Sequence, residues 1–525
     1  MRLSQYSRAL TAAIAAVALA CGGGDGGTGP TNAASVAAVS ATAVTATVAT
    51  VVSPSPQFVV RDASGDGLSN VGVTVTVASG GGTLTGAPTK SSANGTSVGT
   101  WTLGNTAGVN TLRIEVDGLS TPLIISATGT ADVATQLTVA SGNNQSALAA
   151  ATPANSVMFK VGDRFNNGVA GAVVSFSVIG GGGTLPPGSV TVTTDANGIA
   201  IAPTWTLGKS TGVQTLRGTS GAFTANATAT VTSNYTLEVR FFGPAMDPNI
   251  QAAFVTAAAR IQGLLTGDVA NTNVSNLDVA GQCGATGVSP LTEQIDDLIV
   301  YAQVAPNDGP GGILGSAGQC YIRDQSELSL IGIMNFDSAD LQNLLATNRL
   351  DAVILHEMLH TVGIGTLWSR KAQVSQPSTP SVAFIGQQAG AGCLFHGGAA
   401  PNQCGSGTVP VEAGGGSGTA NVHWREVTSG TGIGFNTELM TGFIEAAGIA
   451  MPLSRMSIGS LADIGYTVNL LPFDSYTVPS TAAISLGLIR ESQGFGGRML
   501  LNEILREPVA TVDIMGRVTP IKQRR

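Results

Sequence analysis

The first half of the chain contains an internal repeat, and this repeat restricts what that half can fold into. The segment TWTLG at residues 100–104 returns at residues 204–208, and GVNTLR at 108–113 returns as GVQTLR at 212–217. The period of about 100 residues is the length of one β-sandwich domain. Within the first copy, every second residue of Val71–Val77 is valine, which gives a strand with one apolar and one mostly polar face. We therefore expect two all-β sandwich domains, one for each copy.

The two copies resemble the bacterial immunoglobulin-like repeats of invasin and intimin type. The resemblance rests on the repeated motifs and on turn signals between the apolar runs, such as Ser64–Gly67 and Asp195–Gly198. It implies one immunoglobulin-like domain over residues 36–131 and a second over residues 132–233. It also implies the role of a stalk or spacer, sometimes an adhesive one, with cell-surface or matrix partners.

The N-terminus has the features of an export signal. Two arginines precede an apolar stretch, Ala9–Ala20, that is too short to cross a bilayer, so residues 1–20 are predicted to be a signal peptide. The segment ALAC at residues 18–21 resembles a bacterial lipobox, although an alanine stands where that pattern usually has leucine. The resemblance implies lipidation of Cys21, with the Gly-rich residues 21–35 as a flexible tether. We expect an exported lipoprotein held in the outer membrane or at the cell surface by this lipid anchor. The alternative is an ordinary secretory signal and a secreted protein.

The cysteine count also fits an exported protein. Apart from Cys21 there are four cysteines, an even number of the kind seen in oxidising compartments. Four cysteines allow three pairings, and we favour disulfides Cys283–Cys320 and Cys393–Cys404 because both are local. The alternative is four free thiols.

Composition narrows the class of protein further. Charged residues make up only 11% of the chain and glycines number 70, which is typical of β-rich extracellular modules rather than of a helical cytosolic enzyme. The net charge is −8, and no domain contains a cluster of lysines and arginines. These features exclude a typical nucleic-acid-binding protein.

A different kind of domain follows the repeats. Residues 237–242 have the pattern of a strand, and residues 249–265 have the apolar spacing of an amphipathic helix. Leu350–Val362 is predicted to be a further helix. We expect an α+β domain over residues 234–473, followed by a C-terminal tail or small accessory segment over residues 474–525.

The predicted helix 350–362 carries a metal-binding motif. His356 and His360 are four residues apart, so both imidazoles lie on one face of a helix and can bind the same ion. Glu357 stands beside the first histidine, where its carboxylate can reach a water on the metal. This is the H-E-x-x-H pattern of zinc proteases. The alternative is a buried helix that carries two incidental histidines.

A catalytic zinc ion needs a third protein ligand and one open position. The chain has four histidines, so only His396 and His423 remain as histidine ligands. His396 lies between Cys393 and Cys404, and the residues alone leave it and His423 as alternatives. The family resemblance given next implies that His396 is a loop residue of an insertion rather than a ligand.

The order of motifs after residue 356 resembles leishmanolysin, the gametolysin-like branch of the metzincin proteases. The matching segments are HEMLHTVG at residues 356–363, a long insertion over 364–422, HWRE at 423–426 and ELMTG at 438–442. The resemblance covers roughly residues 235–470. It implies a metzincin-type α+β fold, His423 as the third zinc ligand and Met440 as the Met-turn residue beneath the metal. Thr366 stands where metzincins usually have the third histidine, and Glu438 is expected to be structural rather than catalytic.

Together these features predict a surface-tethered zinc metalloendopeptidase with one catalytic zinc ion. His356, His360 and His423 would hold the zinc, and Glu357 would be the general base when a zinc-activated water attacks a peptide bond. The expected substrates are proteins or peptides.

Other functions remain open from the sequence. One alternative is a surface adhesin or binding protein with a degenerate protease domain, although the intact His356, Glu357 and His360 argue against it. Another is a zinc hydrolase that acts on something other than peptides. Eukaryotic members of the resembled family have more cysteines and an inhibitory propeptide. Here two sandwich domains precede the protease domain, and we identify no cysteine switch.

Overall fold

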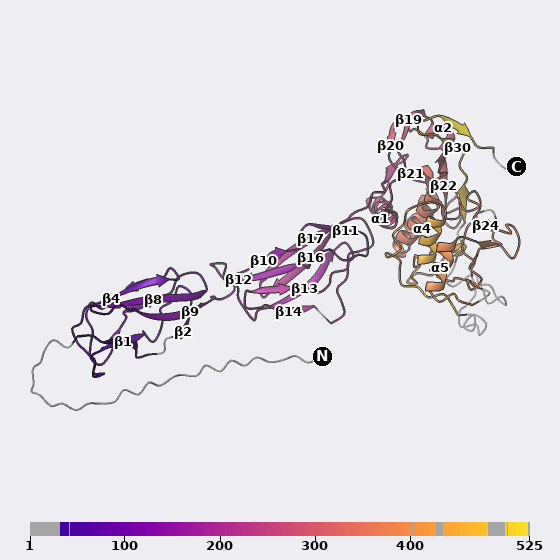
Figure 1. The fold of residues 1–525 in the computed structure, drawn as a ribbon. Coiled ribbons are helices and arrows are strands. Elements are labelled where there is room, and N and C mark those ends of the chain that lie inside the picture. The colour runs from indigo at the N-terminus through magenta and orange to yellow at the C-terminus, as the bar shows by residue number, and fades with distance from the viewer. Residues whose placement is uncertain are drawn as a thin grey trace, which may run out of the picture. The chain divides into compact units, whose positions relative to one another are not determined.

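Figure 1 shows the computed structural model of the chain. The structure describes residues 32–40, 43–188, 190–400, 403–416, 418–426, 434–480, 499–500 and 502–522. The predicted signal peptide, the lipidation site Cys21 and most of the tether lie outside the described residues. Contacts divide the chain into two compact units, and each is described by itself. They are Met1–Val133 with Asp163–Asn167, and Ala134–Gly162 with Gly168–Arg525.

The first unit is a β-sandwich built from short strands. Their bounds are β1 Ser35–Ala38, β2 Ala43–Thr47, β3 Gln57–Arg61, β4 Val73–Ser79, β5 Thr83–Thr85, β6 Thr96–Ser97, β7 Thr100–Thr102, β8 Gly108–Val116 and β9 Leu123–Thr130. One sheet has the order β1-β3-β6 and the other the order β2-β9-β8-β4, while β5 and β7 form a separate pair. The alternation predicted for β4 is confirmed, because Val73 and Val75 are buried while Thr74 and Thr76 are exposed.

The second unit begins with a sandwich of the same design. Its strands are β10 Gln136–Ser141, β11 Gln145–Ala147, β12 Met158–Gly162, β13 Val173–Gly180, β14 Thr191–Thr193, β15 Ile199–Ile201, β16 Gly212–Ser220 and β17 Phe223–Val231. They form sheets of order β10-β12-β15 and β11-β17-β16-β13-β14. Repeated positions are buried in both copies, as shown by the pairs Phe58 and Phe159, Trp101 and Trp205, and Leu112 and Leu216. The repeat in the sequence is therefore a repeat of core positions.

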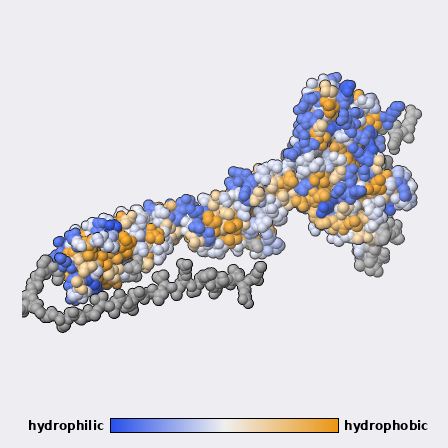
Figure 2. Space-filling view, viewed as in Figure 1, coloured by the Kyte–Doolittle hydropathy of each residue, from blue (hydrophilic) through white to orange (hydrophobic). Residues whose placement is uncertain are grey.

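Several apolar side chains stay exposed on the strands of both sandwiches, among them Val109, Ile124, Val173 and Val213. Figure 2 shows apolar and polar residues mixed over the visible surface of this part of the chain. Among the helices in the described part of the chain, none is both long enough and apolar enough to cross a membrane.

The rest of the second unit combines a mixed sheet with helices. Its helices are α1 Pro248–Leu264, α2 Val279–Cys283, α3 Ser338–Ala346, α4 Leu350–Val362, α5 Gln387–Phe395 and α6 Arg455–Asp463. Its longer strands are β18 Leu237–Phe241, β19 Thr272–Leu277, β20 Leu291–Ile295, β21 Leu298–Ala305, β22 Gly315–Arg323 and β23 Ser329–Asp337. Its shorter strands are β24 Val374–Ser375, β25 Ala383–Phe384, β26 Val409–Pro410, β27 Phe443–Ile444, β28 Met499–Leu500, β29 Glu503–Arg506, β30 Ala510–Val512 and β31 Val518–Pro520.

The main sheet has the order β18-β21-β23-β22-β30-β31, and β29 also pairs with β22. Strands β18, β21 and β23 are parallel, whereas β22 runs antiparallel to β23. Helix α4 packs against β22, β23 and α1. One core cluster of this region includes Phe254, Met358 and Trp424. A second includes Tyr301, Ile331 and the cysteines of the Cys283–Cys320 disulfide.

Substituting alanine for Leu112, which is fully buried in β8, is expected to destabilise the first sandwich by about 2–5 kcal/mol, because it removes apolar contacts and leaves a cavity. The matched control is Val109→Ala on the same strand, where the side chain is 65% exposed and the cost should be within about 0.5 kcal/mol. Hydrogen exchange of peptides from residues 43–130, measured by mass spectrometry, reports the change. Equal loss of protection in both variants would contradict this core assignment.

Candidate metal centre

Helix α4 brings the first two histidines together. Its sequence contains neither glycine nor proline, and it ends where Gly363 takes φ 138° and its N–H bonds to the carbonyl of Leu359. A side chain at Gly363 would collide with Leu367 and Ile464, because a Cβ there would lie 2.7 Å from the Leu367 Cδ1 atom. The helix was predicted over Leu350–Val362, and the structure confirms these bounds. His356 and His360 are both buried on its inner face.

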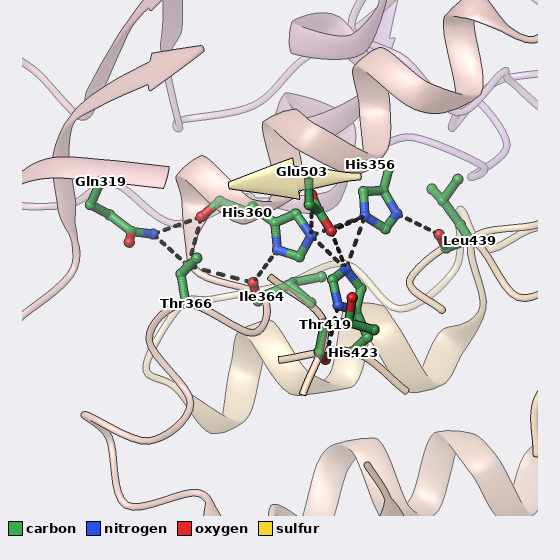
Figure 3. Close-up of polar contacts among 9 residues, drawn as sticks. All are labelled: Gln319, His356, His360, Ile364, Thr366, Thr419, His423, Leu439 and Glu503. Atoms are coloured by element: carbon green, nitrogen blue, oxygen red, sulfur yellow. Dashed lines mark hydrogen bonds and ion pairs between the residues drawn. The ribbon is translucent and has the colours of Figure 1, made fainter. Parts of the chain in front are cut away.

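The third histidine of the site is His423, which reaches the same point after the long insertion. The Nε2 atoms of the three rings are 3.0 Å apart for His356–His360, 3.1 Å for His356–His423 and 3.0 Å for His360–His423. Figure 3 shows the three rings converging. The structure thus brings together the three residues that were predicted to be zinc ligands.

Each ring is oriented by a backbone carbonyl oxygen that contacts its Nδ1. The pairs are His356 with Leu439 (2.7 Å), His360 with Ile364 (2.8 Å) and His423 with Thr419 (3.3 Å). A carbonyl oxygen only accepts hydrogen bonds, so Nδ1 must carry the proton of a neutral ring. The three Nε2 atoms then face one another with lone pairs and without a proton between them.

Burial favours the neutral state of the His360 ring. His360 is fully buried, and its burial lowers the pKa of the imidazole well below the usual value. The carbonyl of His360 accepts hydrogen bonds from Gln319 (2.7 Å) and from the Thr366 hydroxyl (2.7 Å). Thr366, which stands where metzincins usually have a histidine, therefore lies behind His360 and is not part of the group of ligands.

Glu357 is buried beside the histidines. Among the described residues, neither oxygen of its carboxylate has a hydrogen-bond partner. Burial raises the pKa of Glu357 well above its ordinary value, and the nearby carboxylate of Glu503 raises it further. A buried carboxyl group without a donor is a costly arrangement in a protein core. It is also the environment in which a carboxyl group can act as a base near neutral pH.

Glu503 is the residue at this site that the sequence did not reveal. Its side chain is fully buried, and its Oε1 lies 3.0 Å from Nε2 of His423 and 3.9 Å from Nε2 of His356. Its Oε2 lies 3.8 Å from Nε2 of His360. Ligand atoms of these four residues all lie within 4.8 Å of one another. No motif in the sequence marks Glu503, because β29 reaches the site only by pairing with the distant strand β22.

The predicted Met-turn residue, Met440, is fully buried next to the histidines. Its N–H donates to Oε2 of Glu438 (2.6 Å), and its carbonyl accepts from the N–H of Trp424 (3.0 Å). The other oxygen of Glu438 accepts from Ser454 and Ser457. Although burial raises the pKa of Glu438, these hydrogen bonds oppose that shift. Glu438 therefore organises the turn that presents the Leu439 carbonyl to His356.

His396 lies apart from the group of four. Its Nδ1 donates to the carbonyl of Tyr476 (2.9 Å), and its Nε2 accepts from the N–H of Arg455 (2.9 Å). Both ring nitrogens are therefore used to hold the end of α5. The favoured cysteine pairing is present, since the structure joins Cys283 to Cys320 and Cys393 to Cys404.

The residues present fit a zinc ion. Three imidazole nitrogens separated by 3.0–3.1 Å can each lie about 2.0–2.1 Å from one ion, the usual Zn–N distance. A cation among them would satisfy lone pairs that have no donor, and it would offset the buried charge of Glu503, whose two oxygens also lack a hydrogen-bond partner among the described residues. The carbonyl contacts at Nδ1 are the second-shell arrangement that metal-binding histidines usually have.

Neither the comparison with protein-family models nor the comparison with curated proteins gives a match. Solved structures do match. The D0-D1 domain of intimin is 15% identical with a TM-score of 0.16, over 38% of this chain and 97% of that one. The Escherichia coli adhesin FdeC is 21% identical with a TM-score of 0.27, over 40% of this chain and 71% of that one.

Invasin, described as a bacterial integrin-binding protein, is 16% identical with a TM-score of 0.24. The match covers 46% of this chain, which spans about half of the invasin structure, 51%. The matches to intimin, FdeC and invasin concern the N-terminal part of the chain. None of the three structures named here is a protease.

Metal analysis of the purified chain tests the choice of ligands. We expect one zinc ion per wild-type chain and loss of most of that zinc in His423→Ala, because the remaining nitrogens leave the ion with an incomplete set of ligands. The matched control is His396→Ala, which should keep its zinc because His396 contacts only Tyr476 and Arg455 through its ring nitrogens. Circular dichroism of both variants checks that they are folded. Loss of zinc in His396→Ala alone would contradict the assignment of His423.

Proposed function

We propose that the C-terminal domain is a zinc metalloendopeptidase of the leishmanolysin-like, metzincin type. The observation that carries the proposal is the convergence of three neutral imidazole nitrogens beside the buried carboxyl group of Glu357. A metal ion alone accounts for the three histidines. It does not account for Glu357, the next residue of the helix after His356, whose buried carboxyl group interacts with Glu503. A general base next to the metal does account for it.

The residues of the chain then have distinct roles in peptide hydrolysis. The zinc ion would be held by His356, His360 and His423, and as a Lewis acid it would polarise the peptide carbonyl and lower the pKa of water. Glu357 takes a proton from the attacking water and delivers it to the nitrogen of the departing amine. The carbonyls of Leu439, Ile364 and Thr419 keep the rings in the tautomer that exposes Nε2.

We further propose that the enzyme is exported and acts on protein or peptide substrates at the cell surface, tethered through a lipid at Cys21. Support comes from the apolar N-terminal stretch and the cysteine at residue 21. The two disulfides fit an oxidising compartment outside the cytoplasm. In this proposal the two sandwiches are a spacer between the anchor and the metal site.

A second candidate function is that of a surface adhesin whose C-terminal domain does not cleave peptides. The observation that favours it is the pair of repeated sandwiches, and structures named as adhesins are among the matches to this part of the chain. The structural comparisons thus agree better with this candidate than with the peptidase. Since every TM-score quoted is 0.27 or lower, the case for adhesion depends on the sandwiches themselves.

Glu357→Gln is expected to reduce hydrolysis of fluorescein-labelled casein at least about 100-fold, because glutamine cannot accept the proton of the attacking water. The matched control is Asp351→Asn, an exposed position in the first turn of the same helix, which should keep full activity. Zinc content should be unchanged in both, and a chelator should abolish the wild-type activity.

Casein hydrolysis by Glu357→Gln and by Asp351→Asn is measured in the wild-type background. Both are measured again with Glu503→Ala added, since Glu503 lies against the histidines. Full activity of Glu357→Gln in both backgrounds would exclude Glu357 as the base. If no protein in either background cleaved casein although all of them kept zinc, adhesion would become the leading candidate function. The full-length Glu357→Gln chain should then still adhere to immobilised extracellular-matrix protein.

A further inference from the structure

Strand β29, which lies near the C-terminus, runs along strand β22 next to the candidate metal centre. It runs parallel to β22, with Glu503 opposite Gly315 and Arg506 opposite Gly318. The N–H of Leu314 donates to the carbonyl of Asn502 (2.8 Å). Without β29, this end of β22 would be an open sheet edge beside the histidines. Such an edge binds extended peptides by adding them as a further strand.

The surroundings of β29 leave room for a peptide backbone only because they contain glycines. At Gly318, where φ is 146°, a Cβ atom would lie 2.3 Å from the carbonyl oxygen of Arg506. On the other side of the strand, a Cβ atom at Gly418 would lie 2.3 Å from the carbonyl oxygen of Glu503. A single methyl group on either side would therefore displace the strand. This is a slot that fits a chain in extended conformation.

The side chain of Glu503 points from this slot into the metal centre. Its carboxylate lies against the Nε2 atoms of the three histidines at 3.0–3.9 Å, and the structure gives it no hydrogen-bond donor among the described residues. The next residue, Ile504, is exposed, as the alternation of a strand requires. Glu503 thus faces the site, and Ile504 faces away from it.

Contacts on both sides of Glu503 hold the strand in place. Asn502 donates through its side chain to the carbonyl of Gly312 (2.8 Å), and Arg506 donates to the carbonyl of Cys283 (2.7 Å). Further along, β30 buries Ala510 and Val512 in the cluster that contains Tyr321. The C-terminal segment is therefore anchored in the core of the domain, which keeps the Glu503 carboxylate at a high effective concentration at the metal centre.

We propose that residues 502–506 are an autoinhibitory strand, bound along the edge of β22 that receives the peptide substrate, with the Glu503 carboxylate in the coordination position that substrate and water need. The proposal rests on the peptidase function proposed above. The peptide-binding site is then the slot between β22 and Gly418, and an extended peptide can enter only after β29 leaves. Latency is supplied by the C-terminal segment instead of by a segment that precedes the domain.

The alternative is a structural metal site, closed by three histidines and one glutamate. Structural zinc sites have four protein ligands, whereas catalytic sites keep one position for water or substrate. The two cases differ in what happens when Glu503 is removed. A structural site loses its metal or its fold, whereas an inhibited catalytic site keeps its metal and becomes accessible.

The experiment compares the full-length wild type with Glu503→Ala, with the isosteric Glu503→Gln, and with Glu507→Ala as the matched control, since Glu507 is exposed four residues further on. Each protein is prepared with cobalt in place of zinc, and its metal content is measured. Acetohydroxamate, a small metal chelator that needs an open position, is then titrated while visible absorption reports its binding. Casein hydrolysis by the zinc forms is a separate readout.

We expect Glu503→Ala and Glu503→Gln to keep one metal ion and to bind acetohydroxamate at least about tenfold more tightly than the wild type, because an intramolecular competitor has been removed. Casein hydrolysis should rise by a similar factor, and Glu507→Ala should match the wild type in every readout. Should the chelator bind more tightly while no variant cleaves casein, the strand would still be the occupant of the open position and the peptidase function would fail.

Two results would overturn the proposal. Equal acetohydroxamate affinity in the wild type and both Glu503 variants would show that the carboxylate does not occupy the open position. Loss of metal from both Glu503 variants, with Glu507→Ala unaffected, would show that Glu503 completes a closed structural site. The second result would also count against catalysis, whereas the first would leave the Glu357→Gln comparison as the test of the peptidase function.

Discussion

Three imidazole lone pairs facing one another are the constraint on which the C-terminal domain depends. Nitrogen atoms 3.0–3.1 Å apart with no proton between them repel, so this arrangement is favourable only around a cation. Two of the rings come from a single helix, but the third arrives after the whole insertion. A bound metal ion would therefore join the two ends of that insertion, and its free energy of binding would contribute to the free energy of folding.

The orientation of the histidine rings depends in turn on residues that are not themselves metal ligands. Each ring is oriented by one carbonyl oxygen, and the carbonyls belong to Ile364, Thr419 and Leu439. The last of these is placed by Glu438, whose carboxylate ties the turn to Ser454 and Ser457 at the start of α6. The turn Glu438–Met440 thus links helix α6 to helix α4, because Glu438 binds Ser454 and Ser457 while the Leu439 carbonyl binds His356. A change at Glu438 would consequently act on metal affinity without touching the metal.

Local features of this domain were predictable from the sequence, and distant pairings were not. Helix α4 was predicted with its observed bounds because its residues favour a helix and Gly363 ends it. The residues alone left His396 and His423 as alternatives, and only the resemblance to leishmanolysin selected His423. The structure shows the physical difference, since both ring nitrogens of His396 are used by Tyr476 and Arg455.

No motif in the surrounding sequence marks Glu503 as a site residue. Strand β29 is short, and its neighbours in sequence contain no motif, so its position follows only from the parallel pairing with β22. Parallel pairing between segments far apart in the chain depends on the tertiary fold, which strand patterns do not encode. The segment 474–525 was accordingly expected to be a tail or a small accessory segment. Of its described residues, 502–522 extend the main sheet and place the Glu503 carboxylate beside the three histidines.

The two carboxylates at the centre bear on whether the site is open or closed. A closed structural site needs only Glu503 as its fourth ligand, so Glu357 would be a second buried carboxyl group at a cost in free energy and without a function. In a catalytic site Glu357 is the base that the reaction requires. Under the proposed function, Glu503 would occupy the position that substrate and water need, 3.0–3.9 Å from the histidine Nε2 atoms.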